Sequence, residues 1–234
     1  LEQEGKFQQA FTEYQAAERL APGRYQLHTN LDTVLNHLGR PHAAVAEYRE
    51  AIRLKPDMAA LHDRLGNTLV ELGQDEAALA EFRTALQLDP AYFWAHLGIA
   101  DMQLKAGQDE AALAEMRDAI SRDPDNYQIL AYAAHLLAAS DNPEIRDSHT
   151  AVVLAVRANE LTGGHRPSVL DVLGMACAAN GDFTNAIAVT QHALDLARAA
   201  NLNGLEPLEQ RLQLYQKHQP WRESFRATNA PAIH

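Results

Sequence analysis

Proline and glycine recur along this chain with a fixed period of 34 residues. The two series are Pro22, Pro56, Pro90 and Pro124, and Gly5, Gly39, Gly73 and Gly107. The stretch from Gly73 to Glu81 also recurs unchanged from Gly107 to Glu115. Two series of helix-breaking residues with one period indicate an internal repeat. The 234 residues are therefore predicted to fold as a row of similar small units rather than as one or two compact domains.

The residues between these breakers follow helical spacing. In residues 59–92, Leu65 and Leu69 lie on one face of a helix that ends at Gly73, where a left-handed residue closes the last turn. Small and aromatic residues then mark one face of a second helix, which ends before Pro90. Each unit is therefore predicted to be a pair of antiparallel helices.

This pattern resembles the tetratricopeptide repeat (TPR) of bacterial-type proteins. That repeat has 34 residues, with Leu and Gly in its first helix, Ala, an aromatic residue and Ala in its second, and Pro near its end. Residues 59–92 match at Leu65, Gly66, Leu69, Gly73, Ala78, Phe82, Ala85 and Pro90. The resemblance implies an all-α fold, a right-handed α-solenoid of stacked antiparallel helix hairpins that forms a superhelix.

The period divides the chain into a partial repeat, five full repeats and a C-terminal cap. In order, these are residues 1–24, the second helix of a truncated repeat; full repeats at 25–58, 59–92, 93–126, 127–166 and 167–200; a capping helix at 201–223; and a disordered tail at 224–234. The alanines of the second helix in 127–166 come about five residues late, which predicts an inserted turn between its helices.

The two ends of the chain carry further expectations. Residues 205–217 form an amphipathic segment, which predicts a helix that covers the apolar side of the last hairpin. The chain starts in mid-repeat at Leu1, without Met and without a basic or apolar leader. We therefore expect a fragment or a processed form of a longer protein, with no signal peptide.

The charge of the chain is acidic and uneven. Its formal net charge is −11, which argues against a general affinity for nucleic acid or anionic lipid. Residues 59–126 contain 13 acidic and 5 basic side chains, a net −8. This acidic middle predicts a basic partner segment, unless the charges belong only to solvated helix surfaces. No apolar run is long enough to span a membrane, so we expect a soluble segment, either cytoplasmic or periplasmic.

The sequence offers little for catalysis or metal binding. His28, His62 and His96 recur with the period, but equivalent positions in stacked hairpins lie about 10 Å apart, too far to share one metal ion. They are predicted to be partly buried packing residues. Cys177 has no second cysteine, and no nucleophile motif or phosphate-binding loop occurs. We therefore predict no enzyme activity, no cofactor and no metal site.

The resemblance places partner-binding residues on the first helix of each repeat, at positions that do not pack. The candidate groove residues are Asn30, Thr33, Asn36, Arg64, Asn67, Glu71, Trp94, Asp101, Lys105, Tyr132 and His135, with Asp63 and Asp171 at further groove positions. Trp94 and Tyr132 are the best anchors for a bound segment, because large aromatic side chains supply contact area at low entropic cost. The alternative for either is packing against the neighbouring hairpin.

Three functions stay open at this point. The first is a non-catalytic scaffold that binds a protein or peptide in the groove. The second is the C-terminal arm of a larger bacterial membrane glycosyltransferase-like enzyme, because residues 211–223 look like the closing segments of such proteins. The third is self-assembly through the open N-terminal hairpin, where Phe7, Phe11 and Tyr14 are predicted to be exposed.

Overall fold

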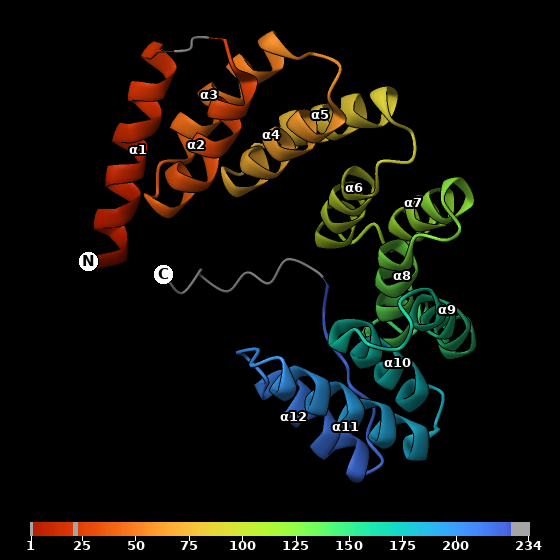
Figure 1. The fold of residues 1–234 in the computed structure, drawn as a ribbon. Helices are drawn as coiled ribbons and strands as arrows, with labels where there is room; N and C mark the ends of the chain where they lie inside the picture. The colour runs from red at the N-terminus through yellow and green to blue at the C-terminus, as the bar shows by residue number, and fades with distance from the viewer. Residues whose placement is uncertain (1, 21–22, 226–234) are drawn as a thin grey trace. The chain divides into compact units, whose positions relative to one another are not determined.

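The computed structural model describes residues 2–20 and 23–225 of the chain. Within these residues its helices and strands are all α-helices (Figure 1). Their bounds are α1 Glu2–Leu20, α2 Tyr25–His37, α3 Pro41–Leu54, α4 Ala59–Glu71, α5 Asp75–Leu88, α6 Phe93–Lys105, α7 Asp109–Arg122, α8 Tyr127–Ala139, α9 Ser148–Leu161, α10 Pro167–Ala179, α11 Phe183–Ala199 and α12 Glu206–Gln216. The chain divides into two compact units, Leu1–Ile99 and Ala100–His234.

The first unit consists of helices that pack on their neighbours in the sequence. Helix α2 packs on α3 and α4 on α5, while α1 contacts α2 and α3 contacts α4 (Figure 1). The turns inside these two pairs pass through Gly39 and Gly73, whose φ angles of 63° and 68° lie in the left-handed region that favours glycine. The spacing of the glycines in the sequence is therefore the spacing of the turns.

One aromatic ring fixes the distance between neighbouring repeats in the first unit. Phe82 on α5 is fully buried and lies against two glycines, Gly66 on α4 and Gly98 on α6. A Cβ atom would come within 2.7 Å of the ring at Gly66 and within 2.6 Å at Gly98. Both first helices therefore need glycine where they meet this ring.

The N-terminal helix does not leave its aromatic side chains exposed, as the sequence had suggested. Phe11 and Tyr14 are partly buried against Leu31, Leu35 and Ala44, which lie on α2 and α3. Phe7 is also partly buried, and its ring stacks on His37 with the centroids 4.1 Å apart. The prediction of three exposed aromatic residues is wrong because α1 turns this face toward α2.

In the second unit, α8 packs on α9, α10 packs on α8, α9 and α11, and α12 packs on α11. Residues 140–147 connect α8 to α9, whereas residues 180–182 suffice between α10 and α11. In this longer connection, the Asp147 carboxylate accepts a hydrogen bond from the backbone N–H of Thr150 and so caps α9.

The helix expected at residues 205–217 is α12, and the rest of the capping segment assigned to residues 201–223 is not helical. Glu223 forms an isolated parallel bridge with Ser140. Its N–H donates to the Ala139 carbonyl and its carbonyl accepts from the Asp141 N–H, both at 2.9 Å. The residues after Phe225, where we expect a disordered tail, lie outside the described part of the chain.

Candidate functional site

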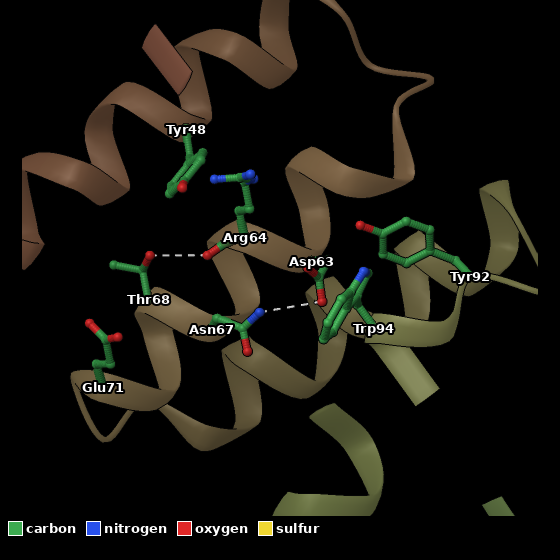
Figure 2. Close-up of a pocket in the computed structure, with 8 residues that line it drawn as sticks. All are labelled: Tyr48, Asp63, Arg64, Asn67, Thr68, Glu71, Tyr92 and Trp94. Carbon is green, nitrogen blue, oxygen red and sulfur yellow. Dashed lines mark hydrogen bonds between the residues drawn. The ribbon is translucent and has the colours of Figure 1, made fainter. Parts of the chain in front are cut away.

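The first unit contains a hollow of about 400 Å³ on the face of its first helices (Figure 2). Eight residues line it: Tyr48, Asp63, Arg64, Asn67, Thr68, Glu71, Tyr92 and Trp94. The residues from α4 lie on one helix face because they are spaced by three or four positions. Four of the predicted groove residues are among them, and Asp63 was at a further groove position. The register of the repeat therefore brings together one part of the predicted site.

Asp63 is the buried charge of this hollow. The residue is 5% exposed, and its Oδ1 accepts a hydrogen bond of 3.3 Å from Asn67. Burial raises the pKa of the Asp63 carboxyl to about 6, although the charge of Arg64 acts in the opposite direction. Asp63 is therefore a carboxylate whose charge is poorly compensated within the protein.

Two aromatic residues accompany Asp63. Trp94 is 48% exposed, and Figure 2 draws its indole and the ring of Tyr92 on the side of the hollow where Asp63 lies. Burial, with the charge of Asp63 as a second cause, raises the pKa of Tyr92 to about 12. The Arg64 guanidinium instead points toward Tyr48 (Figure 2).

The remaining predicted residues of the first unit do not line this hollow. Asn30 lies on α2 and is exposed. Thr33 and Asn36 also belong to α2, but their side chains lie outside what the structure describes. The assignment of these three residues to a binding face stays a prediction.

In the second unit, Asp101 and Tyr132 bind each other. The Tyr132 hydroxyl donates a hydrogen bond to the Asp101 carboxylate, which joins α6 to α8. Burial raises the pKa of Tyr132, and the charge of Asp101 adds to the effect. Tyr132 is therefore held by the neighbouring repeat, which is the packing alternative considered for it. Lys105 is exposed at the end of α6.

His135 is occupied by the chain itself. Its Nε2 pairs with the Glu223 carboxylate, and its ring meets the edge of the Phe225 ring at a centroid distance of 5.4 Å. The hydrogen bond to His135 is the main reason why the pKa of Glu223 is lowered. The C-terminal segment thus covers a residue that the register of the repeat had assigned to a partner.

The same segment helps to bury an ion pair. The Arg211 guanidinium of α12 donates to both oxygens of Asp171 on α10, at 2.8 and 2.5 Å, and the two side chains are 12% and 15% exposed. The Arg211 guanidinium also lies over the ring of Trp221, with the guanidinium carbon 5.3 Å from the ring centroid. Burial raises the pKa of Asp171, while the charge of Arg211 opposes that effect.

Two of the recurring histidines link the helices of their hairpins. His28 and His62 are buried, as expected, and the Nδ1 of each lies 2.7 Å from the carboxylate of Glu47 or Glu81 on the following helix. Neither glutamate was among the residues predicted from the sequence. The sequence does contain a pattern that points to them, because Glu47 and Glu81 are 34 residues apart, as His28 and His62 are.

The part of the chain that the structure describes has neither a metal-binding group of side chains nor an exposed thiol. Among these residues, no group of three or more His, Cys, Asp or Glu side chains is placed to hold a metal ion. Cys177 is buried, and burial raises the pKa of its thiol. Within the same residues, every helix is too short or too polar to cross a bilayer.

Two family models match the chain, one described as a TPR repeat at residues 66–107 and one as a tetratricopeptide repeat at residues 1–59. The chain is a tetratricopeptide repeat protein. No curated protein matches it in sequence. TPR repeats generally mediate interactions between proteins.

Solved TPR structures share the fold of this TPR protein. A thermophilic TPR protein of Thermus thermophilus superposes with a TM-score of 0.62 at 20% identity, over 83% of this chain and all of the other. A tetratricopeptide repeat protein from Parabacteroides merdae gives a TM-score of 0.53 at 16% identity, over 92% and 80% of the two chains. The prediction of an all-α fold of stacked helix hairpins, the α-solenoid class, is confirmed.

Proposed function

We propose that this TPR protein is a non-catalytic scaffold that binds a segment of another protein at the hollow of its first unit. The observation that carries this proposal is the hollow itself, which gathers four residues chosen from the repeat register alone: Arg64, Asn67, Glu71 and Trp94. A half-exposed indole beside charged and amide side chains is typical of the residues that dominate binding energy in protein interfaces.

The second unit supports the proposal because it contains an internal example of a segment bound in this way. There, the segment that includes Trp221 and Phe225 lies against α8 and the connection that follows it, with backbone hydrogen bonds to Ala139 and Asp141 and an ion pair and a ring contact with His135. These are the interactions that an extended partner segment would offer to the same face elsewhere.

A selection from a random peptide library tests the proposal. Peptides selected on the full chain are measured for affinity against the wild type, Trp94→Ala and Arg64→Glu. We expect Trp94→Ala to weaken the selected peptides by at least about tenfold, since truncating an interface anchor typically costs about 2 kcal/mol or more. Arg64→Glu reverses a charge that lines the hollow and is expected to change their affinity by a similar factor.

The matched control is Arg83→Glu, which reverses an exposed charge on α5, away from the hollow. This control is expected to bind the peptides as the wild type does. Peptides whose affinity is unchanged by both hollow variants would place the binding face elsewhere and overturn the proposal.

A further inference from the structure

Two first helices carry aspartate at their fifth residue, Asp63 on α4 and Asp171 on α10. The two side chains therefore occupy equivalent places in two repeats of one chain, and both are largely buried. What differs is the group that each one meets.

The aspartate of α10 shows what this position accepts. The two oxygens of Asp171 accept from Nε and one Nη of Arg211, and the ring centroid of Trp221 lies 5.3 Å from the carbon of the same guanidinium. Arginine suits this place because its planar group bonds to both carboxylate oxygens and stacks on an aromatic ring at the same time. A compact ammonium group does not combine these contacts.

The aspartate of α4 has similar surroundings without the arginine. Asp63 accepts a hydrogen bond from Asn67 through Oδ1 and forms no ion pair with a described residue. It lines the hollow together with the indole of Trp94 and the ring of Tyr92. A buried carboxylate without a cation at contact distance is unfavourable, and a cation that reached it would bind strongly for the same reason.

The charge around the hollow favours the same ligand. Glu71 lines it, and residues 59–99 of the first unit contain six acidic and two basic side chains, a net charge of −4. The summed field therefore attracts cations toward the hollow and raises their rate of association.

We propose that Asp63, with Trp94 and Tyr92, is a receptor for an arginine side chain of a bound protein segment, in the arrangement that Arg211 adopts between Asp171 and Trp221. The inference rests on the proposed function and names the chemistry of its partner. The arginine enters the hollow, its guanidinium donates to Asp63, and its face stacks on the aromatic wall.

The test uses three blocked pentapeptides that differ at one residue, with arginine, lysine or citrulline in the centre and Gly-Ser on each side. Citrulline keeps the shape of arginine but removes its charge. Binding to the full chain is measured from the NMR signal of the Trp94 indole N–H. The chain has two tryptophans, and the signal that is missing in Trp94→Phe identifies the one from Trp94. We expect the arginine peptide to bind at least about tenfold more tightly than the citrulline peptide, with lysine in between.

Two variants connect this preference to the aspartate. Asp63→Asn keeps an acceptor for Asn67 but removes the charge, and we expect it to bind the arginine and citrulline peptides equally. Glu76→Gln removes one charge from the exposed start of α5 and is expected to keep the preference of the wild type. Circular dichroism of both variants verifies that they are folded.

The outcomes separate this inference from the proposed function. Equal binding of arginine and citrulline by the wild type, or an arginine preference that survives in Asp63→Asn, overturns the arginine receptor. Library peptides that need Trp94 and Arg64 but contain no arginine overturn it as well and leave the scaffold in place. Library peptides indifferent to both hollow variants overturn the scaffold function, and the receptor with it.

Discussion

The two units of this TPR protein use the face of their first helices differently. In the second unit, the segment after α12 contacts His135, and α12 supplies the arginine that pairs with Asp171. In the first unit, the equivalent Asp63 lies in a hollow beside a half-exposed tryptophan. The difference shows that one repeat register can produce either an internal contact or an open hollow, depending on what the rest of the chain places against it.

The largest expected effect is at the internal contact. Arg211→Ala leaves the carboxylate of Asp171 largely buried without its cation and removes the support of Trp221, so we expect the second unit to lose about 3–5 kcal/mol of unfolding free energy. Denaturant unfolding of the variant in a Trp94→Phe background reports on this unit, because the remaining tryptophan is Trp221.

The control for this prediction is another ion pair of α12. Arg198→Ala removes the pair with Glu209, whose side chains are 51% and 45% exposed, and is expected to cost less than about 1 kcal/mol. Equal losses in the two variants would show that burial does not distinguish the two pairs.

The second prediction concerns the equivalent aspartate. Because the folded state holds the pKa of Asp63 at about 6, above the unfolded value of about 4, ionising it costs stability as the pH rises through this range. At pH 7.5, Asp63→Asn should therefore stabilise the first unit by about 2–3 kcal/mol, as long as no cation occupies the hollow.

The gain should shrink as the pH falls from about 6 to about 4 and vanish below that, where Asp63 is protonated in both states. Unfolding in a Trp221→Phe background measures it, because Trp94 then reports on the first unit. A stabilisation that does not change between pH 7.5 and pH 4 would contradict the assigned cause.

The smallest effect is expected at the fourth residue of the first helices. His62 occupies it in α4, paired with Glu81, whereas buried leucines, Leu130 and Leu170, occupy it in α8 and α10. Glu81→Ala leaves the buried imidazole without its partner and should cost the first unit about 1–2 kcal/mol.

The double variant His62→Leu with Glu81→Ala imitates the second unit and should recover most of this loss, because no buried polar group remains unsatisfied. Thermal unfolding of the single and double variants measures both steps. A double variant less stable than Glu81→Ala alone would show that the hairpin needs the imidazole for its shape.

The sequence predicted those parts of the molecule that obey the period. The hairpins and the face that holds Arg64, Asn67 and Glu71 follow from the spacing of small and apolar residues, because equivalent positions in stacked repeats face the same way. Tyr92 could not be placed in the hollow by that reasoning, since it belongs to the connection before α6 rather than to a first helix.

The contacts of the C-terminal segment could not be predicted from the 34-residue period either. Residues 217–225 have no counterpart in the repeats, so nothing in the register predicts that Glu223 and Phe225 reach His135. Contacts between residues so far apart in the sequence depend on tertiary packing, which local patterns do not encode. This is why one predicted partner residue proved to be part of the protein's own packing.

The ring of Phe82 affects the width of the hollow, although Phe82 is not one of the residues that line it. The ring lies against Gly66 on α4 and Gly98 on α6, the helices that carry Asp63 and Trp94. The ring therefore helps to set the separation of the helix that carries the carboxylate from the helix that carries the indole. A smaller residue at position 82 would let these helices approach and narrow the hollow, which makes a core residue a determinant of what size of side chain can enter.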